Sequence, residues 1–79
     1  MSTHLTLALD RAEGALLRVL GTIERRGWDV LAVNAASADG GPYSVELTLG
    51  GPRDPQVLCR QLERLVDVRE VNLLEESTR

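Results

Sequence analysis

The chain has 79 residues, which bounds it to a single domain. Hydrophobic residues make up 43% and charged residues 27% of the sequence, a composition typical of a folded domain and not of a disordered segment. The net charge of −3 and the presence of only two aromatic residues, Trp28 and Tyr43, argue against nucleic-acid binding, which needs a clustered positive surface or several stacking rings.

The first residues lack the positive segment and unbroken apolar run of a signal peptide, and no stretch approaches the roughly 20 apolar residues of a membrane span. The sequence has one cysteine, Cys59, so it forms no internal disulfide and offers no cysteine pair to a metal. We therefore expect one cytoplasmic domain over residues 1–79, with a core at about 3–74 and a polar tail at 75–79.

Apolar and polar residues alternate from Thr3 to Leu9, which predicts a strand with one buried face. Asp10 and Glu13 have the spacing of a capping box, so we expect a helix to open at Asp10. One helical face is apolar and comprises Ala12, Leu16, Val19, Leu20 and Ile23. Gly27, after two arginines, is expected to end this helix in a left-handed conformation.

Residues 28–36 predict a second strand that is apolar on both faces. One face holds Trp28, Val30 and Ala32, and the other holds Leu31, Val33 and Ala35. A small domain with an exposed apolar strand risks aggregation, which favours pairing of this strand with a second chain over exposure in a monomer. The predicted interface residues are Val30, Leu31, Ala32, Val33 and Asn34.

The second half repeats the pattern of the first. Residues 37–42 predict a turn, residues 43–49 a strand with Tyr43, Val45, Leu47 and Leu49 inward, and residues 50–53 a loop. Asp54 as N-cap and Pro55 predict a helix start, followed by an apolar face of Leu58, Leu62, Leu65 and Val66 and a last strand over 68–74. The order β-α-β-β-α-β predicts an α+β, ferredoxin-like fold, with two helices on one face of a four-stranded antiparallel sheet.

A set of catalytic residues is hard to assemble from this sequence. His4 reads as a solvated strand histidine, Cys59 as a structural thiol, and Asp67 and Glu70 as surface charges. Gly14 is unusual, because glycine within the first turn of a helix costs about 1 kcal/mol relative to alanine. It indicates either the close approach of a ligand or backbone, or simple tolerance of glycine, and the sequence leaves both open.

Three segments resemble the ACT-domain family. Glu13–Val19 is similar to the Gly-Ala-Leu-x-Arg-Val opening of its first helix, and Arg25–Val30 is similar to the step from that helix into the second strand. Gln61–Val68, followed by Val71, resembles the ending typical of acetolactate (acetohydroxyacid) synthase small subunits. Val45–Leu49 with Gly51–Arg53 looks most like the short, isozyme II type of this subunit. The resemblance covers nearly the whole chain, from about Leu5 to Leu74.

This resemblance implies a non-catalytic regulatory subunit in branched-chain amino-acid biosynthesis. Such a subunit binds and activates the large catalytic subunit, which carries thiamine diphosphate, Mg²⁺ and FAD and joins two 2-keto acids with loss of CO₂. No cofactor, metal or catalytic residue is expected on this chain. The family also implies a homodimer formed by sheet extension. A free-standing ACT-domain sensor of amino acids is the alternative; an acylphosphatase or a metal chaperone lacks its required residues.

In valine-binding members the effector lies at the paired interface, which maps onto Arg11, Glu13, Gly14, Ala15, Asp29 and Val30 of this chain. Arg11 and Asp29 stand where those members usually have asparagine. An asparagine amide both donates and accepts hydrogen bonds, whereas arginine only donates and aspartate normally only accepts. We therefore expect weak or absent valine feedback.

Overall fold

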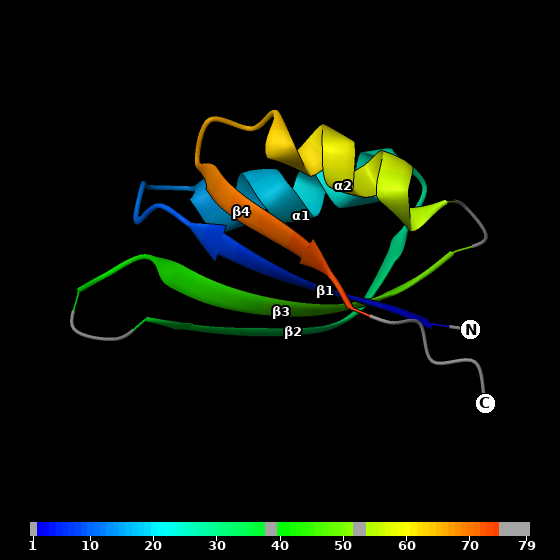
Figure 1. Cartoon of the computed structure of the whole chain (residues 1–79), viewed down its shortest axis with the longest axis horizontal. Helices are drawn as coiled ribbons and strands as arrows, with labels where there is room; N and C mark the ends of the chain where they lie inside the picture. Colours follow the sequence, from blue (N-terminus) through cyan, green and yellow to red (C-terminus); the bar gives the residue numbers. More distant parts are fainter. Residues whose placement is uncertain (1, 38–39, 52–53, 75–79) are drawn as a thin grey trace.

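The structure is a computed structural model that describes residues 2–37, 40–51 and 54–74. Its elements are β1 (Ser2–Leu9), α1 (Ala15–Arg25), β2 (Asp29–Ser37), β3 (Tyr43–Gly50), α2 (Pro55–Glu63) and β4 (Val68–Leu73). This order confirms the predicted β-α-β-β-α-β arrangement (Figure 1). Parts of the predicted turn and loop, at 38–39 and 52–53, and the predicted tail at 75–79 lie outside the described residues.

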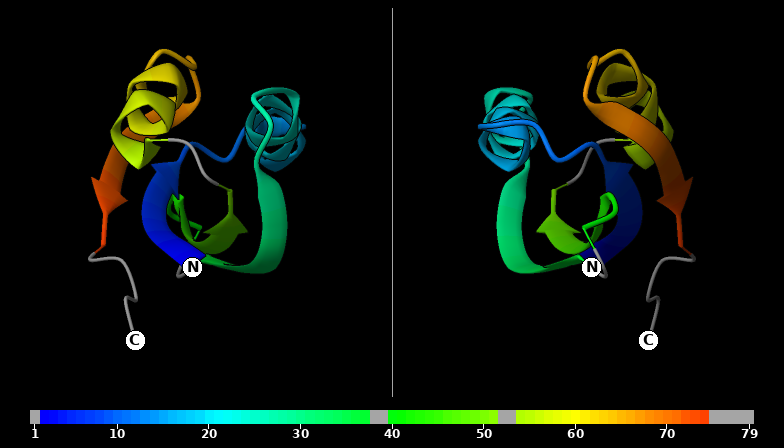
Figure 2. Two further views of the ribbon diagram at one scale, coloured as in Figure 1. Left: turned by 90° about the vertical axis from the view of Figure 1, so that its right-hand side faces the viewer. Right: turned by 90° about the vertical axis from the view of Figure 1, so that its left-hand side faces the viewer.

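The four strands form one sheet in the order β2-β3-β1-β4, and each neighbouring pair is antiparallel. Both helices lie on the same face of this sheet, side by side (Figure 2). In this strand order β2 and β4 are the two edge strands. The central strands β1 and β3 supply most of the buried sheet surface.

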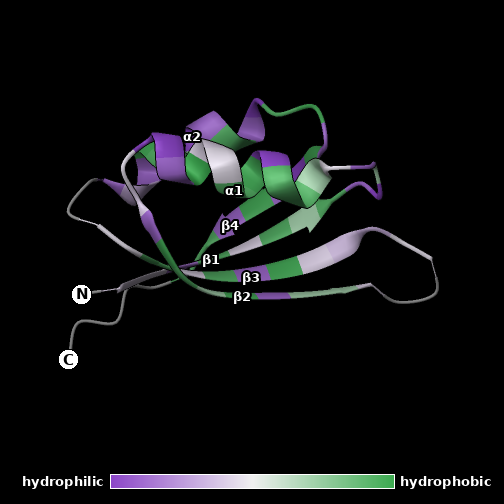
Figure 3. Ribbon diagram, turned by 180° about the vertical axis from the view of Figure 1, so that it is seen from behind, coloured by the Kyte–Doolittle hydropathy of each residue, from purple (hydrophilic) through white to green (hydrophobic). Residues whose placement is uncertain are grey.

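The core forms between the helices and the inward residues of the central strands. Every second residue of β1 from Thr3 onward and of β3 from Val45 onward is buried, as the alternation predicted. Figure 3 shows the hydropathy of the residues along these strands. The buried hydrophobic residues are Leu5, Leu7, Leu9, Ala15, Val19, Ile23, Trp28, Val45, Leu47, Leu49, Leu58 and Leu62. The predicted inward residue Tyr43 is partly buried against this cluster.

The predicted opening of the first helix at Asp10 is wrong, because α1 begins at Ala15. The backbone N–H of Asp10 donates to the carbonyl of Asp67 at 2.8 Å, and the Asp10 carboxylate pairs with Arg69 at 2.6 Å. Both groups that would have capped a helix are thus occupied by the other end of the chain. Gly14 is the N-cap, and among residues 2–37, 40–51 and 54–74 no side chain caps the helix. Gly27, at φ 91°, follows the helix as predicted.

The second strand begins at Asp29, and its two faces are not those predicted. Val30 pairs with Leu49 and Ala32 with Thr48, so a bulge at Leu31 interrupts the register. An extra residue in one strand reverses the facing of every residue after it. Val33 and Ala35 therefore share the face of Val30, whereas Ala32 and Asn34 lie opposite. Trp28 precedes the strand and is buried in the core.

The second helix opens as predicted. The Asp54 side chain accepts a hydrogen bond from the Gln56 backbone N–H at 3.0 Å, and Pro55 occupies the first turn. The helix ends at Glu63, earlier than its apolar pattern indicated. Leu65 still packs against the core, but Val66 is 89% exposed, so its assignment to the buried face was wrong.

Candidate functional site

A shallow depression of about 350 Å³ lies at the N-terminus of α1. Its lining residues are Ala12, Glu13, Gly14, Ala15, Leu16, Leu17, Ala35 and Tyr43. Three of the predicted effector residues, Glu13, Gly14 and Ala15, are therefore together in one place. Since no side chain of the described part of the chain caps α1, this end of the helix presents its backbone dipole to the depression.

The backbone of Gly14 explains the presence of glycine at this position. Its φ of 77° lies in the left-handed region, which is unfavourable for residues that carry a Cβ. A Cβ atom on Gly14 would also lie 3.2 Å from the Arg18 Nη1 atom. Gly14 therefore does not sit inside the helix, as the sequence indicated, but bends the chain into it.

Arg11 lies beside the depression and is held by two residues that sequence reasoning missed. Its Nη1 donates to the Ser37 hydroxyl at 2.6 Å, and its guanidinium lies 5.2 Å from the centre of the Tyr43 ring. Ser37 and Tyr43 are Cα partners at the ends of β2 and β3, so the hairpin delivers both to this place. No local sequence signal marks either residue, because only the strand register brings them together.

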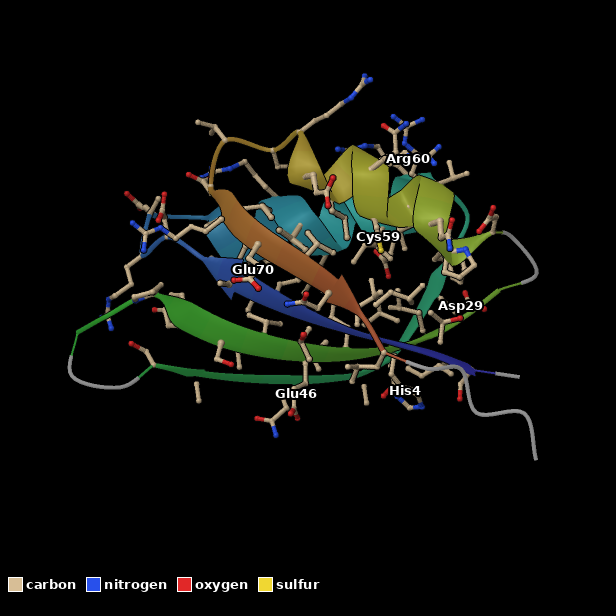
Figure 4. All side chains as sticks on the ribbon, in the orientation of Figure 1. His4, Asp29, Glu46, Cys59, Arg60 and Glu70 are labelled. Atoms are coloured by element: carbon tan, nitrogen blue, oxygen red, sulfur yellow. The ribbon has the colours of Figure 1, made fainter. Side chains whose placement is uncertain are left out.

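Asp29 and Val30 lie at the other end of β2 from this depression (Figure 4). Asp29 pairs with Gly50, whereas Ser37, the neighbour of Arg11, pairs with Tyr43. Asp29 and Ser37 are eight residue steps apart along β2, which corresponds to roughly 25 Å at the usual rise per residue. A single chain thus divides the predicted effector residues into two groups.

The predicted interface residues occupy an exposed edge strand. Leu31 is 61% and Val33 41% exposed, and Ala32 and Asn34 are exposed as well, whereas Val30 is partly buried. Leu17, which lies on α1 in the depression, is 75% exposed. Apolar side chains and the outer backbone edge of β2 are therefore open along one side of the domain.

Asp67 is not the surface charge that the sequence indicated. Its carboxylate accepts hydrogen bonds from Arg18, the one from Nε at 2.9 Å, and its side chain is only 13% exposed. Together with the Asp10–Arg69 pair and the Asp10–Asp67 backbone bond, it ties the start of α1 to the start of β4. The Arg18 side chain of this clamp passes beside the Gly14 bend.

The remaining reactive side chains have structural surroundings. The His4 Nδ1 atom lies 3.3 Å from the Thr48 hydroxyl, its Cα partner in the sheet. Cys59 packs partly against the core, and this burial, with smaller contributions from Glu63 and Asp54, raises the pKa of its thiol. Among residues 2–37, 40–51 and 54–74, no three potential metal ligands cluster, and no helix has the length and apolarity to cross a membrane.

Comparison with solved structures shows the fold. The ACT domain from GTP pyrophosphokinase of Chlorobium tepidum superposes in its crystal structure with a TM-score of 0.78, covering 94% of this chain and 97% of that chain at 14% identity. Its solution NMR structure gives a TM-score of 0.77, covering 98% and 89% at 14% identity. The predicted ferredoxin-like fold of the ACT type is thereby confirmed.

Sequence comparison identifies the relatives. The model of the ACT domain family matches residues 11–71. The acetolactate synthase isozyme 2 small subunits of Escherichia coli K12 and Shigella flexneri are each 39% identical over 64 residues, which are 80% of this chain and 74% of each relative. The chain therefore belongs to the ACT domain family, within the group of acetolactate synthase isozyme 2 small subunits.

Proposed function

We propose that the chain binds the catalytic subunit of acetolactate synthase and activates it in branched-chain amino-acid synthesis. The observation that carries this proposal is the 39% identity to isozyme 2 small subunits across 80% of the chain. Activation would be a shift of population, in which the chain binds more tightly to a catalytic-subunit conformation with an ordered active site. Thiamine diphosphate, Mg²⁺ and FAD would belong to that partner, and this chain would contribute no catalytic group.

Two copies of the chain would pair through β2. The exposed edge with Leu31 and Val33 supports this arrangement, because pairing covers both the apolar side chains and the open backbone groups. A two-fold axis near Val33 would run the two β2 strands antiparallel. Asp29 of one copy would then lie opposite Ser37 of the other, and the two separated groups of effector residues would meet across the interface.

The same arrangement supports weak valine feedback. Arg11 is anchored on Ser37, so Asp29 of a second copy would arrive beside the Arg11 guanidinium. An ion pair between Arg11 and Asp29 would occupy the polar groups that asparagines leave free to bind an amino acid in valine-sensing members. The depression beside Gly14 would persist, but its charged groups would already be engaged.

Reconstitution tests the proposal. Purified chain is mixed with the acetolactate synthase catalytic subunit from the same source, and acetolactate formation is followed with and without valine. Activation with little response to valine is the expected result. Activation with full valine inhibition would keep the regulatory role and refute the argument from Arg11 and Asp29. Absence of both activation and co-elution would refute the regulatory role itself.

A free-standing amino-acid sensor is the second candidate function, and the depression at the uncapped N-terminus of α1 favours it. A thermal-shift screen of the free chain against amino acids separates the two. A ligand at one hundred times its dissociation constant adds about 2.7 kcal/mol to the free energy of unfolding, which is an easily detected shift. A shift without activation of the catalytic subunit would favour the sensor.

A further inference from the structure

The nine cationic residues of this acidic chain are all arginines, and the structure distributes them unevenly. Among the residues that the structure describes, ion pairs within 4 Å engage Arg18 and Arg69. Arg11 lies against Tyr43 and Ser37. The four other described arginines, none of them in such a pair, are Arg25, Arg26, Arg60 and Arg64, and all four belong to the helical layer.

These four arginines line or flank the groove between the two helices. A depression of about 410 Å³ in this groove is lined by Thr22, Arg25, Arg26, Gln61, Arg64 and Leu65. Arg60 lies on α2, one helical turn before the C-cap residue Arg64, and on the side of the helix turned away from the sheet (Figure 4). We call this surface, defined by Arg25, Arg26, Arg60 and Arg64, the arginine groove.

The groove is partly preorganised by hydrogen bonds to neutral partners. Arg26 Nη2 donates to Gln61 Oε1 at 2.9 Å across the two helices, and Arg25 Nη2 donates to the Thr22 hydroxyl at 3.3 Å. These bonds fix the side chains without neutralising their charge. Glu24 and Glu63 are on the same helices, yet neither forms an ion pair within 4 Å with an arginine of the groove.

Like charges gathered on one surface repel one another, so this arrangement has a cost unless an anion occupies the groove. The guanidinium group matches a carboxylate through two parallel hydrogen bonds, and four such groups along a groove fit several carboxylates in a row. Pairing between copies already has a surface in the exposed edge strand β2, so the groove is assigned to a different partner.

We infer that the arginine groove is the surface through which the chain docks an acidic segment of the catalytic subunit. The inference rests on the proposed function. It adds which face of the domain contacts the catalytic subunit and that the contacted segment is acidic. It leaves β2 free for pairing between copies, since the groove lies on the helical layer and β2 lies at the sheet edge. A dimer would thus present two such grooves.

The test compares two variants of equal net charge in the reconstituted complex. The groove variant carries Arg25→Gln and Arg64→Gln; both residues are exposed, and the Arg26–Gln61 bond is left intact. The control carries Arg53→Gln and Arg79→Gln, which remove the same charge at arginines that are not members of the groove. Two exposed charge pairs of ordinary strength correspond to an increase in Kd of about 2- to 30-fold.

The expected result is weaker binding of the groove variant to the catalytic subunit, with a flatter dependence of Kd on salt, while the control binds like the unmodified chain. Poly-glutamate peptide should compete with the catalytic subunit for the unmodified chain and not for the groove variant. Circular dichroism of both variants checks that the fold is unchanged. A further variant, Arg25→Glu with Arg64→Glu, should bind more weakly still.

Each opposite outcome is informative. Equal binding and equal salt dependence of the groove variant and the control would overturn the arginine groove while leaving the proposed function intact. A changed oligomeric state of the groove variant, with unchanged affinity for the catalytic subunit, would assign the groove to a second copy and overturn the inference. Failure of the unmodified chain to bind the catalytic subunit would overturn both proposals.

Discussion

Two glycines of the first helix lead to opposite predictions for the same substitution. Gly21 lies inside α1, and a Cβ atom there would meet only Arg25 Nη1 at 3.5 Å, an ordinary contact. Replacing it with alanine removes the entropic cost of glycine in a helix, so Gly21→Ala should stabilise the chain by about 0.5–1 kcal/mol. Gly14→Ala should destabilise it by about 1–2 kcal/mol, because alanine disfavours the left-handed backbone at φ 77°.

Urea unfolding followed by the fluorescence of Trp28 measures both effects. Trp28 is the single tryptophan and is 3% exposed in the folded chain, so its emission reports loss of the core. With a denaturant slope of about 1 kcal/mol per molar, the midpoint should rise by about 0.5–1 M for Gly21→Ala and fall by about 1–2 M for Gly14→Ala. Protein concentration is held constant, since association between copies would shift the midpoint.

A shift of both midpoints in the same direction would contradict a left-handed backbone at Gly14 combined with a helical one at Gly21. A neutral or destabilising Gly21→Ala, with an unchanged slope, would mean that another chain approaches α1 closely at this residue. A stabilising Gly14→Ala would mean that residue 14 has a helical backbone and that the helix begins earlier than Ala15.

Two more predictions follow from the clamp and the thiol. In a double-mutant cycle with Arg18→Met and Asp67→Asn, the coupling energy should be about 0.5–1 kcal/mol, because the Asp67 side chain is only 13% exposed; a coupling near zero would mean that this ion pair does not tie α1 to the start of β4. The pKa of the Cys59 thiol is raised in the folded chain, so the folded state holds this proton more tightly than the unfolded state does. Stability should be full below the unfolded pKa of about 8.5 and decline as pH rises through the folded pKa, and urea midpoints for Cys59→Ala should show a smaller decline.

The parts of the fold that sequence predicted best are those with a regular period. β1 and β3 alternate along their whole length, so their buried residues followed directly from the pattern. The start of α1 was missed because Asp10 looks like a helix cap locally, while Asp67 and Arg69, more than fifty residues away, take its backbone and side chain. The bulge at Leu31 could not be predicted, because a strand that is apolar on both faces shows no break in its alternation where an extra residue is inserted.

The candidate site divides in the same way. Glu13, Gly14 and Ala15 are adjacent in sequence, so predicting the helix was enough to predict that they lie together at one depression. Ser37 and Tyr43 were missed because their position beside Arg11 depends on the register of the β2–β3 hairpin. The arginine groove was missed because its members come from two helices, and scattered arginines in a sequence give no sign that an antiparallel helix pair will bring them together.

The position of β1 has a consequence for how the chain folds. β1 is made first, yet its two neighbours in the sheet are β3 and β4, and Leu5 pairs with Leu73 near the far end of the described chain. Contacts between such distant residues form slowly, since the loop between them must close first. During synthesis, the edge of β1 that pairs with β4 therefore remains without its hydrogen-bond partner until β4 leaves the ribosome. We expect this unpaired edge of β1 to favour aggregation of the nascent chain in that interval, and the pairing of β1 with β3 leaves one edge exposed rather than two.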